Sequence, residues 1–227
     1  DAFSSIRDEV VIGTKAGLVS YASKPQFDVK SLESSIHSSL SRLKTEYIDI
    51  LYLHNITINE LESEKELITF IEGLKSDGKI RALGLSLPSL NSAKHLIEIF
   101  NPDFLQFNFN MMDWRLVDEG YLDFCELKGC SIVARTPLAG GFLTGDITSK
   151  TTFISSDHRS RYSKVLIQKI LEFRQDLSES LSIDPSNFYE YAIRFCLSFK
   201  NIVTVIPGIL TPQQATDNAL ISNFGGL

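Results

Sequence analysis

The sequence predicts an α/β fold, namely a parallel (β/α)8 TIM barrel of which about six βα units are visible in 227 residues. Short apolar runs rich in β-branched residues alternate with longer segments of helical period, which is the order of βα units around a parallel sheet. Each run is nearly apolar on both faces, as in a strand covered by helices on one side and a packed interior on the other. Because a closed barrel needs eight strands and typically about 250 residues, we expect one barrel domain over residues 1–227, incomplete at its N-terminus.

Six apolar runs define the expected strands. They are Val10–Thr14, Ile48–His54, Ile80–Ser86, Phe104–Phe109, Ile132–Thr136 and Ile202–Pro207. Helices are expected at Asp28–Leu43, Glu60–Lys75, Ser89–Ile99, Val117–Lys128, Ser163–Leu181, from Asp184 through about Ser198, and from Thr211–Pro212 onward. The first of these is the clearest, because an Asp cap precedes an apolar stripe with three- and four-residue steps.

The composition excludes several classes of function. Lys and Arg number 22 against 28 Asp and Glu, and no basic stretch carries interleaved aromatics, so nucleic-acid binding is not expected. Three cysteines with no C-x-x-C pair or Cys/His cluster predict neither a disulfide framework nor a structural metal, and they favour a reducing compartment. No apolar run approaches the roughly 18 residues that span a bilayer, and residues 1–6 lack an initiator Met and the apolar core of a secretory signal. We expect a cytoplasmic protein.

Polar, chemically capable residues recur where the apolar runs end. They are Lys15, His54, Ser86, Gln106, Asn108 and Asn110. A lysine after a strand is more often a solvated loop residue, and an isolated histidine is more often structural. In a barrel, however, the carboxyl ends of all strands meet at one face, where active sites are built. The shared placement therefore favours a single functional pocket.

The residue types at these ends indicate carbonyl chemistry. A Lys ammonium and a His imidazole at one site suit polarisation of a carbonyl group and proton transfer to its oxygen. No Gly-x-Ser-x-Gly elbow and no metal-ligand motif occurs in the sequence, so acyl transfer and metal catalysis are not indicated.

Two segments are candidates for phosphate binding. Thr136–Gly145 follows a strand, and its glycines would let backbone N–H groups approach an anion. Ile206–Gly208 leads into the helix at Thr211, whose N-terminal N–H groups and dipole favour phosphate. Glycines after a strand are more often turn residues, and neither segment is a Walker loop or a G-x-G-x-x-G fingerprint.

Six strings occur in order along the chain and together resemble the successive signatures of the aldo-keto reductase family. They are Ile-Gly-Thr-Lys, Tyr-Ile-Asp-Ile-Leu-Tyr-Leu-His, Gly-Lys-Ile-Arg-Ala-Leu-Gly-Leu-Ser, Phe-Leu-Gln-Phe-Asn-Phe-Asn, Thr-Pro-Leu-Ala-Gly-Gly-Phe-Leu-Thr-Gly and Val-Ile-Pro-Gly. The resemblance runs from about Val10 to Asn218, and Asp157–Tyr162 resembles a loop of bacterial-type members.

The resemblance implies hydride transfer from NAD(P)H to the carbonyl of an aldehyde or ketone, with an Asp, Tyr, Lys, His tetrad. Lys15 matches the tetrad lysine, which favours the ionised Tyr, and His54 matches the histidine that orients the carbonyl. The family places its Asp and its proton-donating Tyr upstream of Asp1. Tyr21, Tyr47 and Tyr52 do not occupy the matching position.

The resemblance also assigns cofactor positions. Ser86 and Gln106 match residues that hold the nicotinamide carboxamide, and Arg135 matches a ring-stacking residue. Thr136, Leu138, Gly141 and Thr144 fall in the loop over the pyrophosphate, and Gly208, Gln214 and Asn218 match the adenosine end. Leu87 stands where many members have Asn, and Gly208 and Leu210 are uncharged where NADPH-preferring members often have Lys or Arg. The resemblance favours NADP(H) and leaves NAD(H) open.

Three readings remain open. The first is an NAD(P)H-dependent reductase acting on a small-molecule carbonyl substrate, with no nucleic-acid or membrane partner. The second is a catalytically weak or inactive cofactor-binding regulatory protein, and the third is a degenerate paralogue that begins near Asp1. The oligomeric state and the substrate are not readable from these residues.

Overall fold

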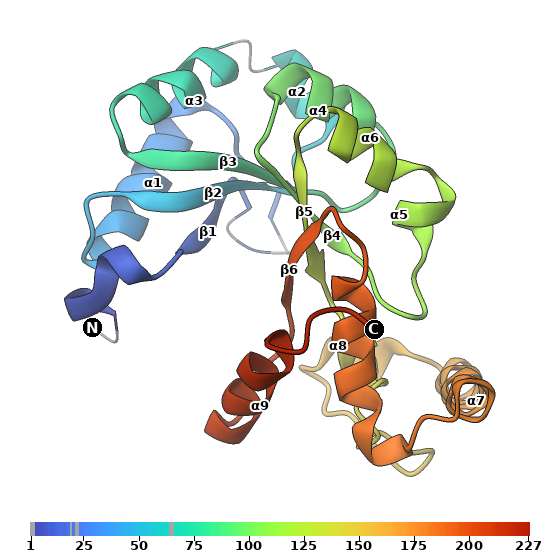
Figure 1. Cartoon of the computed structure of the whole chain (residues 1–227). Coiled ribbons are helices and arrows are strands. Elements are labelled where there is room, and N and C mark those ends of the chain that lie inside the picture. Colours follow the sequence, from blue (N-terminus) through green and yellow to red (C-terminus); the bar gives the residue numbers. More distant parts are fainter. Residues whose placement is uncertain (1–2, 19, 21–22, 64–65) are drawn as a thin grey trace. The chain divides into compact units, whose positions relative to one another are not determined.

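Six strands alternate with helices in the computed structural model, which describes residues 3–18, 20, 23–63 and 66–227 (Figure 1). The strands are β1 (Gly13–Ala16), β2 (Ile48–His54), β3 (Ile80–Ser86), β4 (Phe104–Asn108), β5 (Ser131–Arg135) and β6 (Ile202–Ile206). From β2 onward each expected strand agrees with the structure to within one residue at each end.

The first expected strand, Val10–Thr14, is wrong by three residues at its start, since β1 begins at Gly13. Local bonding gives the reason. The Ile12 N–H donates to the Asp49 carboxylate at 2.9 Å, and the Val10 carbonyl accepts from Arg7 at 3.0 Å. Side chains thus bind the Ile12 N–H and the Val10 carbonyl, so regular pairing with β2 begins only at Gly13.

Three helices begin where their caps predict. The Asp28 side chain accepts from the Ser31 N–H at the start of α1 (Val29–Leu43), and Ser163 accepts from Leu166 at the start of α7 (Lys164–Leu181). Thr211 caps α9 (Pro212–Ser222) in the same way. The remaining helices are α2 (Ile58–Ser63), α3 (Leu67–Ser76), α4 (Ala93–Phe100), α5 (Arg115–Asp118), α6 (Tyr121–Leu127) and α8 (Phe188–Leu197). Short 3-10 turns lie at Ser4–Glu9, Ala139–Gly141, His158–Arg161 and Pro185–Asn187.

Four expected helices are corrected by the structure. Glu60–Lys75 is divided between α2 and α3, with residues 64 and 65 outside the described part. Val117–Lys128 is split because Gly120 adopts a left-handed φ of 69° between α5 and α6. Ser89–Ile99 begins only at Ala93. In the segment from Asp184 to Ser198, the Asp184 side chain caps a 3-10 turn before α8 starts.

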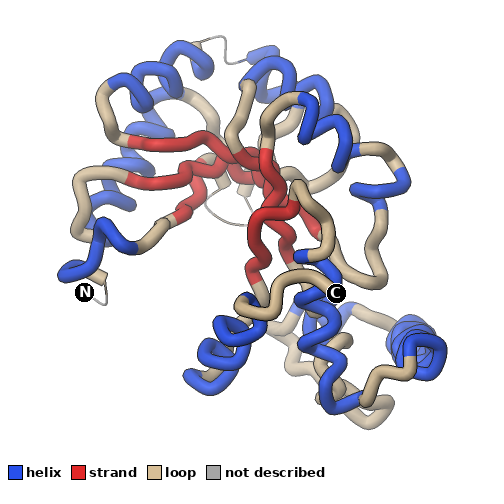
Figure 2. Tube along the Cα trace, in the orientation of Figure 1, coloured by secondary structure: helices blue, strands red, loops and turns tan. Residues whose placement is uncertain are grey.

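The strands, drawn in red in Figure 2, follow one another in the order β1-β2-β3-β4-β5-β6. They belong to two compact units, residues 1–107 with 120–133, and residues 108–119 with 134–227. The first unit contains β1, β2, β3 and most of β4 and β5. The second unit contains the carboxyl ends of β4 and β5 together with β6. The single barrel domain over 1–227 stays a prediction.

In the first unit the parallel register fixes which side chains share a face. Lys15 pairs with Tyr52, His54 pairs with Ser86, and Ser86 pairs with Gln106. Because successive strand residues point to opposite faces, these residues all lie on one side of the sheet. The opposite side is apolar and almost fully buried, with α1 packed on β1 and α3 on β3. Its residues include Leu51, Leu53, Leu83, Leu85 and Leu105.

In the second unit α8 packs against β6 and α9. Its core is a cluster of buried apolar residues from α8 and the neighbouring loops, namely Met111, Leu143, Ile183, Phe188 and Ala192. The expectation that every strand is covered on both faces fails for β6, where Val203 is 52% exposed and Ile206 39% exposed.

Across the part of the chain that the structure describes, no helix combines the length and apolarity needed to cross a membrane.

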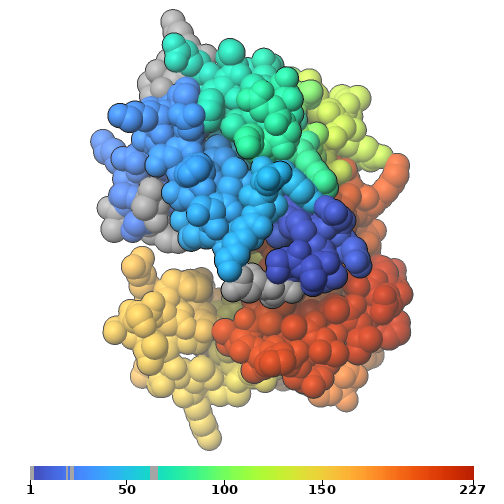
Figure 3. All heavy atoms as spheres, turned by 90° about the vertical axis from the view of Figure 1, so that its left-hand side faces the viewer, coloured from blue at the N-terminus to red at the C-terminus, as the bar shows by residue number. Residues whose placement is uncertain are grey.

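An ion network ties down the amino end of β2. The carboxylate of Asp49, which is 5% exposed, accepts from Arg7 at 2.7 Å and from Arg81 at 3.0 Å. Arg7 also donates to the Tyr47 carbonyl at 3.1 Å. The N-terminal segment, dark blue in the space-filling view, accordingly lies directly against the lighter blue surface of the same unit (Figure 3). This network lies at the opposite end of β2 from His54.

Burial alone would raise the pKa of Asp49, but hydrogen bonds from Ile12 and Arg7 and the charges of Arg7 and Arg81 outweigh it and hold the pKa below its usual range. A carboxyl with a depressed pKa in the folded state contributes stability above the unfolded pKa of about 3.9. That contribution is lost as the pH falls through the folded pKa.

We expect Asp49→Asn to lower the free energy of unfolding by about 1.5–3 kcal/mol at neutral pH, the usual cost of removing hydrogen bonds to a charged group. The variant should also lose less stability than the wild type below about pH 4. Urea unfolding at several pH values measures both effects. The matched control is Glu33→Gln, which removes an exposed carboxylate from α1. Equal stability of the two variants at neutral pH would contradict the role of this network.

Candidate active site

Lys15 and His54 lie on the same face of neighbouring strands. Lys15 is half-buried on β1, and its ammonium lies 5.9 Å from the centroid of the Tyr52 ring on β2. His54 is half-buried at the end of β2, two residues beyond Tyr52. The register thus brings a cation and an imidazole to the same edge of the first unit, as the sequence led us to expect.

The ring of Tyr52, which is 4% exposed, lies on the same sheet face as Lys15 and His54. The ring lies across two glycines. A Cβ at Gly84 on β3 would lie 2.3 Å from the ring, and one at Gly13 on β1 would lie 3.2 Å from it. Side chains at both positions are therefore restricted so that the ring can lie flat between its neighbours.

The phenol of Tyr52 stays protonated near neutral pH. Burial raises the pKa of Tyr52 to about 12, although a hydrogen bond with Gln106 lowers it somewhat. Tyr47 is half-buried, and its hydroxyl donates to Asp8, while Tyr21 lies outside the described residues. The described phenols therefore leave Lys15 and His54 as the chemically capable pair on this face.

Ser86 and Gln106 form a buried polar pair beside His54. Ser86 is fully buried and Gln106 is 3% exposed, and their side-chain oxygens lie 3.5 Å apart. The Ser86 carbonyl accepts from the Asn55 N–H at 2.8 Å. Buried polar side chains are costly unless they are hydrogen-bonded, so this pair indicates a built polar site. Leu87, where the family often has Asn, is 1% exposed and belongs to the core.

The second unit contains a cavity of about 680 Å³. Eight of the ten residues that the sequence assigns to the cofactor line it, namely Arg135, Thr136, Leu138, Gly141, Thr144, Gly208, Gln214 and Asn218. They come from the end of β5, the glycine-containing loop after it, the loop after β6, and α9. Two segments far apart in the sequence, 135–144 and 208–218, therefore contribute these residues to one cavity of a size usual for ligand sites.

The chain turns sharply where β5 enters this cavity. Thr136 has a φ of 56°, which is unusual for a β-branched residue and marks a backbone held by its surroundings. The Asn110 amide donates to the Thr136 carbonyl at 3.0 Å. Arg135, one residue earlier, donates through Nε to Asn108 Oδ1 at 2.8 Å. Asn108 and Asn110, which the sequence placed in the pocket, thus position the end of β5.

The glycine-containing loop differs from the expected backbone cradle. N–H groups of the loop bind its own carbonyls, including Gly141 to Leu138 at 2.8 Å and Thr144 to Gly141 at 3.2 Å. Thr144 Oγ1 also donates to the Gly141 carbonyl. The loop is therefore a set of tight turns, and its N–H groups are largely committed to holding that shape.

Arg159 holds this loop from outside. Its Nη1 donates to the Gly140 carbonyl at 2.7 Å, and its other nitrogens bind both carboxylate oxygens of Asp157, the shortest at 2.6 Å. Hydrogen bonds from Arg159 lower the pKa of Asp157 to about 2, so the pair stays ionised at physiological pH. Gly141, with φ of 93°, lies so close that an added Cβ would be 3.2 Å from Arg159 Nη1.

Sequence reasoning missed the roles of Tyr52, Arg159 and Asp217, of which the last two line the cavity. Asp157–Tyr162 was noted only as a familiar string, although an Asp-x-Arg spacing is a signal for a local bidentate pair. Tyr52 could have been found from the glycines at positions 13 and 84, once the register was known.

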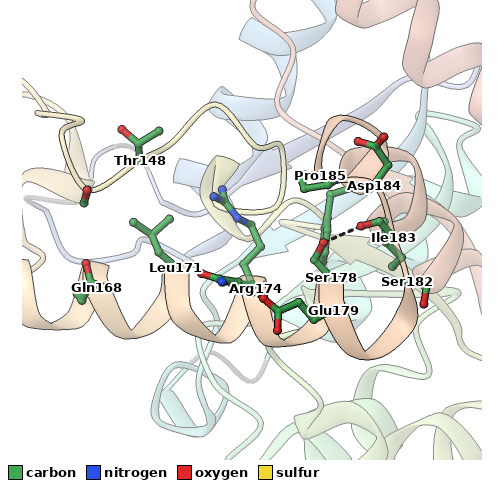
Figure 4. Close-up of a pocket in the computed structure, with 13 residues that line it drawn as sticks. Thr148, Gln168, Leu171, Arg174, Ser178, Glu179, Ser182, Ile183, Asp184 and Pro185 are labelled. Carbon is green, nitrogen blue, oxygen red and sulfur yellow. Dashed lines mark hydrogen bonds between the residues drawn. The ribbon is translucent and has the colours of Figure 1, made fainter.

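A larger hollow of about 880 Å³ in the second unit contains none of the candidate residues. It lies between α7 and the loops around Thr148 and Asp184 (Figure 4). Arg174 in this hollow donates to the carbonyls of Phe142 and Ile147 at 3.2 and 3.1 Å, and Ser178 donates to Ile183 at 2.6 Å. These side chains connect α7 to its neighbouring loops, so their bonding is structural.

Among the described residues, no group of three or more His, Cys, Asp or Glu side chains is arranged to hold a metal ion.

Comparisons with known proteins identify the family. The model of the aldo/keto reductase family matches residues 1–227, so the chain belongs to this family. It is therefore an NAD(P)H-dependent oxidoreductase, and the predicted barrel class is confirmed by its structural relatives.

Three relatives illustrate the range of the similarity. The uncharacterized oxidoreductase YqkF of Bacillus subtilis is 28% identical over 98% of this chain and 72% of its own length. The NADH-specific methylglyoxal reductase of Escherichia coli is 22% identical over 96% of this chain and 71% of its own length. The holo structure of aldo-keto reductase AKR11C1 from Bacillus halodurans superposes with a TM-score of 0.78 at 25% identity, covering 100% of this chain and 72% of that one.

We expect Gly84→Ala to lower the free energy of unfolding by about 1–3 kcal/mol, because the methyl group would force the Tyr52 ring to move in a packed site. The control is Gly73→Ala on the exposed face of α3, where a Cβ meets nothing within 4 Å. It should be neutral or slightly stabilising. Chemical denaturation compares the two, and a Gly84→Ala variant as stable as the control would show that the ring does not lie over Gly84.

Proposed function

We propose that this chain reduces the carbonyl group of small aldehydes or ketones, with Lys15 and His54 as catalytic residues. The observation that carries the proposal is the shared sheet face on which Lys15 and His54 stand in register with a buried pair, Ser86 and Gln106. The family membership of the chain supplies the reaction class.

When bound, the reduced nicotinamide supplies the hydride. The charged Lys15 side chain stabilises negative charge that develops as the carbonyl is reduced, which is the kind of electrostatic assistance that a partly buried site makes effective. His54 orients the carbonyl by donating a hydrogen bond to its oxygen, and the proton that completes the alcohol would come from the proton-donating Tyr that the family resemblance implies. The ring of Tyr52 lies beside Lys15, whose ammonium is 5.9 Å from the ring centroid, and burial keeps its phenol protonated.

The residues present fit a nicotinamide dinucleotide. We propose that Ser86 and Gln106 bind the carboxamide, since buried hydroxyl and amide groups match its donor and acceptor. In the second unit, the cavity combines apolar walls with the cations Arg135 and Arg159 and the amides of Gln214 and Asn218. Such a mixture suits aromatic rings joined by phosphates. Thr136, Leu138, Gly141, Thr144 and Gly208 complete the proposed cofactor site.

A small 2-oxo aldehyde such as methylglyoxal is the first substrate to test, because a relative carries that activity in its name. We also propose a cytoplasmic location. The support is that Cys125, Cys130 and Cys196 are buried thiols outside any disulfide, as is usual in a reducing compartment.

We expect Lys15→Met in the full-length protein to reduce kcat by roughly 100-fold or more, because removing one electrostatic contact to developing charge typically costs that much. The dissociation constant for the reduced cofactor should stay within about threefold, since Met keeps the length and apolar stem of the side chain. Absorbance of the reduced nicotinamide measures turnover, and its fluorescence measures binding. The control is Lys30→Met on the exposed face of α1.

Hydride transfer by Lys15→Met at the rate of the control would remove Lys15 from the reaction. Wild-type protein that binds cofactor but reduces none of a panel of aldehydes and ketones would instead favour a cofactor-binding regulatory protein.

A further inference from the structure

The hydroxyl of Tyr52 is a buried polar group that the proposed reaction does not use. Tyr52 is 4% exposed and lies on the face of β2 that also carries His54. Its ring is confined by the neighbouring strands, because a Cβ at Gly84 would lie 2.3 Å from the ring and one at Gly13 would lie 3.2 Å from it. A phenyl ring would fill this space equally well, and a buried hydroxyl costs free energy unless it is hydrogen-bonded. The partner of the hydroxyl therefore indicates its role.

That partner is the side chain of Gln106 on β4, which is 3% exposed. The bond favours the ionised phenol, which is the effect of a hydrogen-bond donor, so the Gln106 amide donates to the Tyr52 oxygen. The oxygen of the same amide, Oε1, accepts from Ser86 Oγ at 3.5 Å. The Gln106 amide is thus held by β2 through Tyr52 and by β3 through Ser86.

These two bonds restrict the Gln106 amide without using all of its hydrogen-bonding groups. The last torsion of a glutamine side chain is broad, so an amide with a single partner can take many orientations. Bonds at both its nitrogen and its oxygen narrow that range. A primary amide has two N–H donors and two acceptor positions on its oxygen. One donor and one acceptor of Gln106 therefore remain for a ligand, in an orientation that is set in advance.

We infer that Tyr52 is a positioning residue for the cofactor, because its hydroxyl holds the Gln106 amide in the orientation that binds the nicotinamide carboxamide. The inference rests on the proposed function, in which Ser86 and Gln106 bind that group. A carboxamide has a C=O acceptor and N–H donors, so it is complementary to the donor and the acceptor that Gln106 retains. An amide that is held before the ligand arrives loses less side-chain freedom on binding, which favours affinity.

The test compares two ligands by calorimetric titration of the full-length protein. The first is NADH or NADPH, whichever the wild type binds more tightly, and the second is ADP-ribose or its 2′-phosphate, which is the same molecule without nicotinamide. Tyr52→Phe keeps the ring between the glycines and removes the hydroxyl, so we expect it to weaken binding of the reduced cofactor by about three- to tenfold, the effect of one hydrogen bond. Binding of the nicotinamide-free ligand should change by less than about twofold, because this ligand has no carboxamide.

The matched control is Tyr121→Phe in the same unit. Tyr121 is 5% exposed, and its hydroxyl donates to the Leu90 carbonyl at 2.6 Å, so the control also loses one buried hydroxyl bond. The control should bind both ligands as the wild type does. Urea unfolding should show similar losses of stability for the two variants.

A double-mutant cycle shows whether Tyr52 acts through Gln106. Gln106→Ala should itself weaken binding of the reduced cofactor. Adding Tyr52→Phe to Gln106→Ala should weaken it further by less than about twofold, because the amide that Tyr52 holds is already gone. A purely structural role of the hydroxyl would give additive losses.

The outcomes separate this inference from the proposed function. Wild-type protein that binds neither NADH nor NADPH would overturn the proposed function. A wild type that binds cofactor and a Tyr52→Phe variant that binds it equally well would overturn this inference alone. The same result would follow from an equal loss of affinity for the nicotinamide-free ligand, from additive losses in the cycle, or from a Tyr52→Phe chain that does not fold, since each would assign the hydroxyl to the core.

Discussion

The parallel register of β1 to β4 is the constraint on which the candidate site depends. Side chains alternate between the two faces of a strand, so a slip of one residue would carry Lys15 or His54 from the polar face to the helix-covered one. Two features oppose such a slip. The ring of Tyr52 fits only over the glycines at positions 13 and 84, and the Asp49 carboxylate ties β2 to Ile12, Arg7 and Arg81. The packing of the Tyr52 ring and the ionic contacts at the amino end of β2 therefore hold β1, β2 and β3 in the same register.

The two units differ in the part of the candidate site that each carries. The first presents a cation, an imidazole and a buried polar pair on rigid strands, which is the kind of support that precise positioning of reacting groups requires. The second forms a cavity largely from loops. These loops keep their shape through internal hydrogen bonds and the Arg159–Asp157 pair.

Much of the fold could be predicted from the sequence, because apolar runs and caps are local signals. Five strands and the starts of α1, α7 and α9 follow directly from them. The start of β1 was misplaced because Ile12 bonds to Asp49, which is 37 residues away. The break at Gly120 depends on a left-handed φ that a single glycine permits but does not require. The positions of Lys15, His54, Ser86 and Gln106 could be chosen from strand ends. The packing of Tyr52 over the glycines and the bond from Arg159 to the Gly140 carbonyl are tertiary contacts that no local pattern encodes.

A crystal structure of the full-length protein with NADH tests the central claim most directly. The account predicts that Ser86 and Gln106 lie within hydrogen-bond distance of the nicotinamide carboxamide, with Lys15 and His54 beside the reactive ring. A carboxamide held by other residues, or a Lys15 side chain on the helix-covered face of β1, would contradict it.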